Sequence, residues 1–264
     1  MFPIMMKDEY KQNGFYSPLV LFGLEQAKIY RNYLEEVENR IGPLHYFAKT
    51  YTMMRWVYEV ATNKILLDVV EDLIGQNILL YNATFIIKEP MTKTHVSWHQ
   101  DLTYWGFDDN EKQVSAWVAL SKADEISGCM QMIPGSHKKG FFNHKSTSDK
   151  NNVLSRGQTV NNVELDKAVL CPLKPGEASL HHGLTLHASN PNNSKDRRIG
   201  LNFQYITPDL KQLKSNDDSA LCVRGEDNYN FYKKDVIAKE NFDIKGHQRL
   251  IERTEHYKKT IREN

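Results

Sequence analysis

The chain has 264 residues, of which 25% are charged and 40% hydrophobic, and its formal net charge is +1 at pH 7. This length can bury a substantial core and fits one large domain or two small ones. The near-neutral charge gives no electrostatic reason to expect nucleic acid or a membrane surface as a partner.

Cysteine usage and the N-terminal residues predict a cellular compartment. Cys129, Cys171 and Cys222 are far apart and odd in number, so they suggest neither a disulfide framework nor a C-x-x-C metal site. This favours a reducing compartment. The first ten residues lack a secretory-signal pattern, and no apolar run approaches the length of a membrane span. We therefore expect a cytoplasmic protein.

The first part of the chain, to about residue 76, is expected to be mostly helical. Residues 22–41 carry apolar side chains at spacings of three and four, and Gly42-Pro43 follows as a stop signal. Residues 53–60 and 64–74 predict two further helices, the second with one polar and one apolar side.

From residue 77 the pattern changes to short segments rich in β-branched and aromatic residues, separated by Pro/Gly turns. Such a series predicts a β-sandwich or barrel, here over about residues 77–207. The expected strands are residues 78–81, 84–87, 114–120, 130–133, 168–173, 178–182 and 199–206.

Two segments fall outside this regular pattern. The polar stretch 138–162 is too long for a hairpin loop, so we expect a functional insertion, most simply a lid. The extension 208–264 ends in a charged helix from residue 244 with little apolar face. Since there is no internal repeat and no linker, we expect a single domain over residues 1–264.

The motif Trp98-His99-Gln100-Asp101 places an imidazole and a carboxylate two residues apart. On a β-strand, residues i and i+2 share a face, so His99 and Asp101 would point the same way. Together they suit non-haem iron(II) if a second histidine completes the site. Nine other histidines compete for that position: His45, His95, His137, His144, His181, His182, His187, His247 and His256.

The segment around His187 stands out among these, because Arg198 follows eleven residues later at the start of an expected strand. Alternation along this strand leaves two interpretations open. The polar row either faces solvent or lines a wet pocket beside a metal. In the second case the planar fork of Arg198 would bind a carboxylate through two charge-assisted bonds. The polar row consists of Arg198, Gly200, Asn202 and Gln204.

His99-Gln100-Asp101, the distal His187 and the spaced Arg198 resemble the phytanoyl-CoA dioxygenase-like (PhyH) family of iron(II)/2-oxoglutarate-dependent oxygenases, in particular its bacterial small-molecule hydroxylases. The resemblance covers roughly residues 15–225. It extends to the segments 96–106, 117–120, 128–130, 133–137, 154–158, 175–177 and 197–201.

The resemblance implies a mainly β fold with flanking α-helices: a double-stranded β-helix (a jelly roll, or cupin-like core) with N-terminal helices packed outside. It implies His99, Asp101 and His187 as iron(II) ligands, and Arg198 as the partner of the distal carboxylate of 2-oxoglutarate. It also suggests that three more side chains lie near this cosubstrate: Gln100, Trp117 and Ser189.

Several alternatives stand beside these assignments. His181 and His182 are the near competitors of His187, and they point to opposite sides of one strand, so only one of them can face inward. Trp117 fits plain core packing equally well. Lys88 and Glu89 are expected to form a surface pair. Four residues are candidate substrate contacts, although core packing or surface ion pairs would also explain them: Tyr104, Trp105, Arg156 and Arg224.

The implied reaction is hydroxylation of an unactivated C–H bond in a small polar metabolite or natural-product intermediate. It consumes 2-oxoglutarate and O2 and releases succinate and CO2. The carboxylate of Asp101 disfavours halogenation, since related halogenases carry a small residue there. Desaturation, ring closure and epimerisation stay open, and a non-catalytic jelly-roll protein that binds a metal or ligand is the weaker alternative. The sequence leaves the oligomeric state open.

Overall fold

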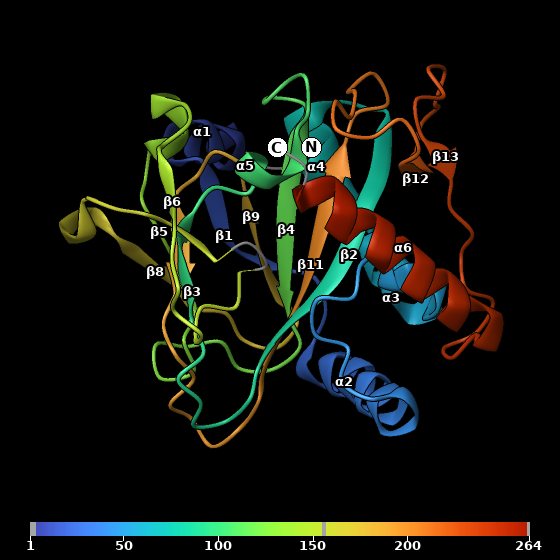
Figure 1. The fold of residues 1–264 in the computed structure, drawn as a ribbon, viewed down its shortest axis with the longest axis horizontal. Helices are drawn as coiled ribbons and strands as arrows, with labels where there is room; N and C mark the ends of the chain where they lie inside the picture. The colour runs from blue at the N-terminus through green and yellow to red at the C-terminus, as the bar shows by residue number, and fades with distance from the viewer. Residues whose placement is uncertain (1–3, 155–156, 263–264) are drawn as a thin grey trace.

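The computed structural model describes residues 4–154 and 157–262 (Figure 1). Two β-sheets face each other, and most of the helices cover the outer side of the larger sheet. The predicted fold class, a mainly β jelly roll with helices packed outside, is confirmed.

The large sheet has seven strands in the order β1-β9-β4-β11-β2-β12-β13. Neighbouring strands are antiparallel except for β12 and β13. The strands are β1 (Phe15–Val20), β9 (Glu177–His181), β4 (Gln113–Ala119), β11 (Arg198–Ile206), β2 (Ile78–Lys88), β12 (Ser219–Arg224) and β13 (Lys233–Lys234).

The small sheet has four strands in the order β3-β10-β5-β8, and a separate hairpin pairs two more. Its strands are β3 (Val96–His99), β10 (His187–Ser189), β5 (Met130–Met132) and β8 (Val169–Cys171). The hairpin consists of β6 (His144–Ser146) and β7 (Gln158–Val160), both in the segment 138–162. That segment is therefore partly structured, and its predicted role as a lid stays a prediction.

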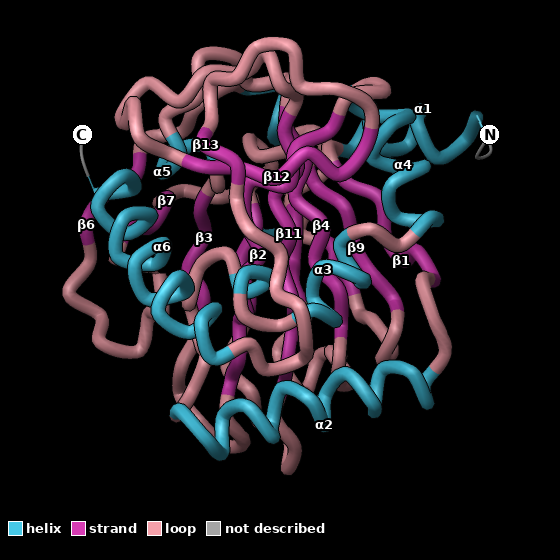
Figure 2. Tube along the Cα trace, turned by 90° about the vertical axis from the view of Figure 1, so that its right-hand side faces the viewer, coloured by secondary structure: helices cyan, strands magenta, loops and turns pink. Residues whose placement is uncertain are grey.

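Helices pack mainly on the outer face of the large sheet, as Figure 2 shows for α2, α3 and α6. The α2 helix ends where Gly42 takes a φ of 90°, which glycine adopts readily. The helices are α1 (Ile4–Asn13), α2 (Leu24–Ile41), α3 (Arg55–Ala61), α4 (Lys64–Ile74), α5 (Leu102–Trp105) and α6 (Ile244–Arg262), with 3-10 turns η1 (Thr50–Thr52), η2 (Ser136–Lys139) and η3 (Leu165–Lys167).

Strand β11 divides the interior into two parts. Its apolar row, which includes Leu201 and Phe203, packs with helix residues such as Trp56 in the main core. Burying each such side chain contributes roughly 1.5–3 kcal/mol. Its polar row faces the space between the sheets, where Asn202 and Gln204 line a cavity. Of the two interpretations of this strand, the inward polar row is the one the structure adopts.

The N-terminal part is mostly helical, as expected, and it also contributes a strand, because β1 pairs with β9 at the edge of the large sheet. One expectation about the elements is wrong. The expected strands 78–81 and 84–87 are one continuous strand, β2. Asn82 does not turn the chain there, since its side chain accepts a hydrogen bond from the Lys49 amide (2.8 Å) while its backbone stays extended.

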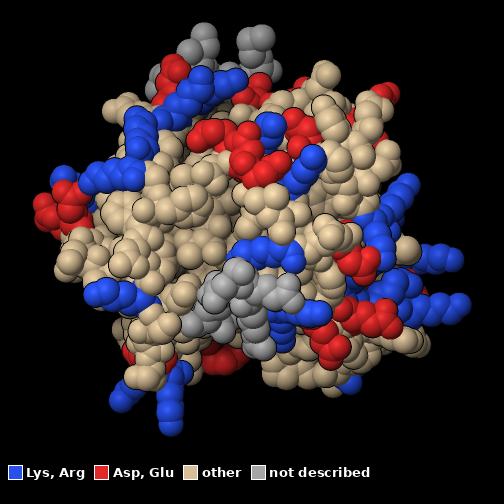
Figure 3. Space-filling model, turned by 45° about the horizontal axis from the view of Figure 1, so that its top comes forward, with Lys and Arg blue, Asp and Glu red and all other residues tan. Residues whose placement is uncertain are grey.

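The C-terminal helix α6 is more firmly packed than its charged sequence indicates. Its own residues Leu250 and Ile261 are buried, and Arg253 Nε lies 3.1 Å from the buried carboxylate of Asp235. On the face drawn in Figure 3, lysine and arginine side chains alternate with acidic ones instead of forming one large patch. In the part of the chain described, no helix combines the length and apolar character needed to cross a membrane.

Candidate active site

Two histidines of the site come from paired strands of the small sheet. His99 ends β3 and His187 begins β10, and the strand register places them opposite each other with ring centroids 4.0 Å apart. Each Nδ1 lies near a backbone oxygen: His99 near Ser97 O (2.9 Å) and His187 near Thr185 O (3.0 Å). If each Nδ1 carries the proton, both Nε2 lone pairs point to the centre, as a metal requires.

Asp101 reaches the same centre by a different route from the one expected. Strand β3 stops at His99, and Asp101 has helical backbone angles (φ −60°, ψ −43°) at the start of α5. The expectation that His99 and Asp101 share a strand face is therefore wrong. The two side chains come together because the chain makes a helical turn directly after β3. Asp101 Oδ1 lies 3.5 Å from His99 Nε2 and 3.8 Å from His187 Nε2.

The second oxygen of Asp101 is already engaged. Oδ2 accepts a hydrogen bond from Ser115 Oγ (2.9 Å) and lies 3.2 Å from His181 Nε2. Burial raises the pKa of Asp101, but its interactions with the imidazoles of His181 and His99 outweigh burial and leave this pKa well below its usual range. The carboxylate is thus ionised, with Oδ2 held and Oδ1 turned to the two imidazoles.

The donor set fits iron(II). Burial, and then the neighbouring His99, lower the pKa of His187 well below its usual value, so this imidazole is neutral. The ligand atoms of His99, Asp101 and His187 all lie within 4.8 Å of one another. Two imidazoles and one carboxylate around a point open on one side are the facial arrangement that non-haem iron(II) takes.

A cavity of about 120 Å³ extends from these three residues between the two sheets. Arg198 lies in its wall with only 1% of its surface exposed. Among the residues described, its Nε and Nη2 have no hydrogen-bond partner, and burial lowers the pKa of Arg198 to about 10. A buried guanidinium without partners is costly unless an anion binds it. A carboxylate group, such as the distal end of 2-oxoglutarate, fits this position.

Trp117 and Gly200 shape this end of the cavity. The Arg198 guanidinium lies over the Trp117 ring, 5.1 Å from its centroid. A Cβ atom at Gly200 would be only 1.8 Å from Trp117 Cζ2, so the indole can pack against β11 only because residue 200 is glycine. Trp117 is therefore both buried and part of the cavity wall, so its position is not explained by core packing alone.

Lys88 does not occupy the surface position expected for it. It is fully buried opposite Arg198 in the sheet, not part of a surface pair with Glu89. Its Nζ donates to Ser189 Oγ (2.6 Å) and Ser189 O (3.0 Å), and Ser189 lines the cavity. Burial, and then the charge of Arg198, lower the pKa of Lys88 to about 6. The alternation of side chains along β2 would have predicted that Lys88 faces inward, because Thr84 and Ile86 on the same face of the strand line the cavity.

Gln100 points away from the cavity. Its Nε2 donates to Leu184 O (2.7 Å) and Gly140 O (2.9 Å), and its Oε1 accepts from Phe142 N (2.8 Å). All its hydrogen-bonding capacity therefore goes to neighbouring backbone. This side chain fastens the loops beside His99 and does not lie in the cavity wall where a cosubstrate contact was expected.

The four candidate substrate residues are separated in the structure. Tyr104 and Trp105 line the cavity from α5. Arg224 lies elsewhere, ion-paired with Glu71 (2.7 Å) and Asp68 (2.8 Å) against α4, which is the surface-pair alternative. Arg156 falls outside the described residues.

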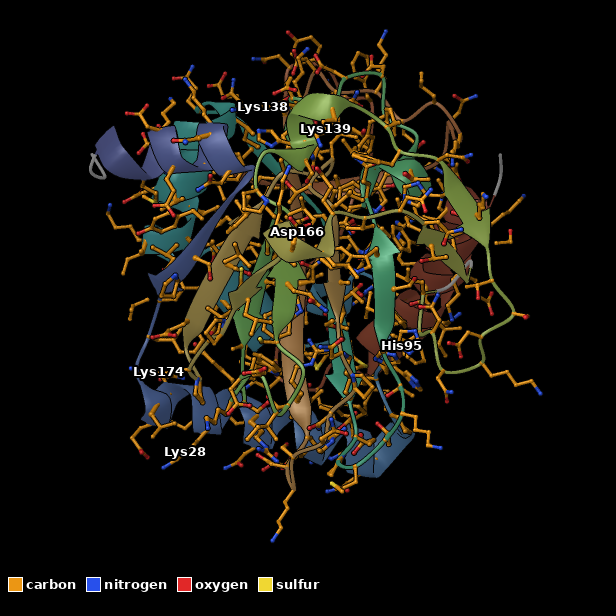
Figure 4. The ribbon with its side chains drawn as sticks, turned by 90° about the vertical axis from the view of Figure 1, so that its left-hand side faces the viewer. Lys28, His95, Lys138, Lys139, Asp166 and Lys174 are labelled. Carbon is orange, nitrogen blue, oxygen red and sulfur yellow. The ribbon has the colours of Figure 1, made fainter. Side chains whose placement is uncertain are left out.

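The competing histidines are also separated. His181 faces the cavity beside Asp101, whereas His182 points to the opposite side, toward Glu111 (3.5 Å). As predicted, only one of the pair faces inward. Figure 4 looks from the side of the small sheet and shows His95 ahead of β3; it lies 3.6 Å from Asp149 and is not among the three residues whose ligand atoms converge.

A sequence profile described as phytanoyl-CoA dioxygenase (PhyH) matches residues 25–200. The chain belongs to the PhyH family. The resemblance drawn from the motifs is therefore confirmed. One relative in this comparison is a probable alpha-ketoglutarate-dependent hypophosphite dioxygenase of Stutzerimonas stutzeri, 30% identical over 200 residues, in a match that covers 73% of this chain and 65% of the relative.

Another relative is the human peroxisomal phytanoyl-CoA dioxygenase, 25% identical over 200 residues, covering 74% of this chain and 58% of the human protein. The chain thus spans about half to two thirds of the length of the first curated relatives it matches. Among solved structures, the apo form of the non-heme monooxygenase ThoJ has a TM-score of 0.84 at 24% identity, over 97% of this chain and 98% of ThoJ.

CytC3 with iron(II) and alpha-ketoglutarate has a TM-score of 0.69 at 20% identity, over 92% of this chain and 97% of CytC3. At these identities the likeness to ThoJ and to CytC3 is one of fold.

Proposed function

We propose that this PhyH-family chain is an iron(II)- and 2-oxoglutarate-dependent dioxygenase that hydroxylates an unactivated C–H bond of a small polar metabolite or natural-product intermediate. The proposal rests on one observation: a single cavity contains both a group of possible metal ligands and a buried guanidinium that can bind an anion. His99, Asp101 and His187 offer three converging ligand atoms, and the buried Arg198 lacks an anion.

In this proposal iron(II), bound together with 2-oxoglutarate, activates O2 for C–H hydroxylation, and 2-oxoglutarate is released as succinate and CO2. The chain's own residues hold and orient. Arg198 binds the distal carboxylate through its two free N–H positions. Ser189 has a hydroxyl hydrogen to donate to the same carboxylate, because its oxygen already accepts from Lys88.

Other residues fix the geometry of the site and keep water out. Ser115 and His181 hold Oδ2 of Asp101, which leaves Oδ1 as its ligand atom. Tyr104, Trp105 and Tyr257 surround the cavity with aromatic surface, and the exclusion of water strengthens every charge interaction inside. The carboxylate of Asp101 occupies the position that a halogenase leaves to a halide ion, which favours transfer of oxygen to the substrate.

Turnover with a matched variant tests the proposal. Protein purified without oxygen is mixed with iron(II), 2-oxoglutarate and candidate substrates; O2 is added, and succinate is measured. We expect O2-dependent succinate from the wild-type protein and none from Asp101→Ala, with the circular dichroism spectrum unchanged. Asp166→Ala, which removes an exposed carboxylate on η3, is the control and should retain activity.

Product analysis decides between related reactions. A product heavier by one oxygen atom supports hydroxylation, whereas loss of two hydrogens or an inverted centre would replace it by desaturation, ring closure or epimerisation. Iron binding with no succinate formed under any condition would favour the non-catalytic alternative.

A further inference from the structure

Part of the cavity wall is formed by two helices, and the cavity reaches the surface there, because Tyr257 and Lys258 in this wall are only partly buried; this end is called its mouth. Tyr104 and Trp105 come from α5, and Tyr257, Lys258 and Ile261 come from α6. The two helices contact each other, and Figure 1 shows the C-terminal end of α6 near α5. The profile that identifies the family matches residues 25–200, so the α6 side of the mouth lies outside the residues that this profile matches.

Helix α6 is held in place over the mouth by polar contacts along its length. Tyr257 Oη donates to Gln204 Oε1 on β11 (3.4 Å). Thr254 Oγ1 accepts from the Ala48 amide (3.0 Å), and Arg253 Nε pairs with Asp235 (3.1 Å). Lys258 therefore extends from a fixed helix, not from a mobile tail.

Lys258 brings a charge to the mouth that no carboxylate of the described residues pairs with. Its side chain is half-buried in the cavity wall, and its Nζ lies 5.8 Å from the centroid of the Phe47 ring. No ion pair of Lys258 with a carboxylate occurs among residues 4–154 and 157–262. A cation held against aromatic and apolar surface attracts an anion more strongly than one in open water.

When iron(II) and 2-oxoglutarate are bound, the charges in the cavity add up to one positive charge, that of Lys258. The negative charge of Asp101 and the positive charge of Arg198 cancel, as do the two charges of iron(II) and the two of 2-oxoglutarate. Lys88 adds little at pH 7, because burial lowers its pKa to about 6. One positive charge therefore remains in the wall at the mouth, where a substrate would enter.

We propose that Lys258 is a substrate-recognition residue and that the substrate is a small organic anion. Its anionic group, a carboxylate or a phosphate, pairs with Lys258. Its less polar part lies along Tyr104, Trp105 and Tyr257 and reaches the metal. The inference rests on the proposed function, since it places the substrate in the cavity that holds the metal and the cosubstrate.

Binding of two matched probes tests the inference without turnover. Under argon, protein loaded with iron(II) and 2-oxoglutarate is titrated with 3-phenylpropionate and with 3-phenylpropanamide, which have nearly the same size but differ in charge. Binding is followed by calorimetry and by tryptophan fluorescence, because Trp105 lies at the mouth. We expect the acid to bind at least about tenfold more tightly than the amide.

Three variants assign the preference to the proposed residue. Lys258→Met should bring the affinity for the acid down to that for the amide, and Lys258→Arg should keep the preference. Lys259→Met, which changes the exposed neighbour, should leave it unchanged. Equal binding of the two probes to the wild type, failure of both to bind at millimolar concentration, or a preference that survives Lys258→Met would overturn the inference. Succinate formation is measured separately, so failure of the proposed function would be seen independently.

Discussion

Replacement of Arg198 by methionine tests the cosubstrate pocket, because it should change two properties in opposite directions. The guanidinium is buried with two unpaired nitrogens, so its charge costs free energy when the cavity is empty. A fall of the pKa from 12.5 to about 10 corresponds to roughly 3 kcal/mol, fully present at pH 7 because pH 7 lies below both values. Arg198→Met should therefore make the unliganded protein more stable, by about 1–2 kcal/mol after loss of the Trp117 contact.

The same replacement should nearly abolish the binding of 2-oxoglutarate. Removing one partner of a buried charge pair typically costs about 2–5 kcal/mol, which weakens binding by about 30-fold or more. At a 2-oxoglutarate concentration 100 times the wild-type dissociation constant, the ligand stabilises the wild type by about 2.7 kcal/mol and the variant by less than about 1 kcal/mol.

Urea unfolding under argon, with iron(II) and with or without 2-oxoglutarate, measures both effects. Arg197→Met is the matched control, because Arg197 pairs with Glu38 and Glu89 on the other face of the strand. An Arg198→Met protein that 2-oxoglutarate stabilises as strongly as the wild type would refute the assignment of Arg198.

Two further replacements test the surroundings of the site. Gly200→Ala should displace the Trp117 ring and weaken 2-oxoglutarate binding by about tenfold, because overpacking costs about 1–3 kcal/mol. Gly23→Ala is the control, since a Cβ there meets nothing within 4 Å, and it should leave the affinity for 2-oxoglutarate, measured by calorimetry, unchanged. His181→Phe should weaken iron(II) binding by about 10- to 100-fold, since Asp101 Oδ2 loses a donor. His182→Phe, on the other side of that strand, should leave iron(II) affinity within about threefold, and equal affinities in the two histidine variants would contradict the role of His181.

The sequence predicts the inward residues of β11 because strand geometry is local. With a period of two, once Arg198 faces the cavity, Asn202 and Gln204 must face it too. The same rule predicts the burial of Lys88, which shares a face of β2 with Thr84 and Ile86. The neighbouring Lys88 and Glu89 alone predict a surface pair, because nothing local in the sequence shows that Ser189 lies above Lys88.

Other features depend on contacts between residues that are distant in the sequence, so the sequence alone does not predict them. Asp101 reaches His99 and His187 through a helical turn that Gln100 helps to hold in place, by hydrogen bonds to Gly140 and Leu184. Lys258 reaches the cavity wall only because α6 packs back across the large sheet. The hydrogen bond from Ala48 to Thr254 that helps to hold α6 there joins residues far apart in the sequence, so no pattern within the helix predicts it. Strand β1 contains Pro18 and is recognisable as a strand only from its pairing with β9.

The central claim is that His99, Asp101 and His187 hold one iron(II) ion to which 2-oxoglutarate binds in the same cavity. An anaerobic optical titration tests it most directly. Iron(II) is added to the metal-free protein, then 2-oxoglutarate, and the visible absorption band of the iron–2-oxoglutarate chelate is recorded. We predict that the band saturates at one iron and one 2-oxoglutarate per chain and is missing in His187→Ala. Iron(II) binding with no band on addition of 2-oxoglutarate, or an unchanged band in His187→Ala, would contradict the account.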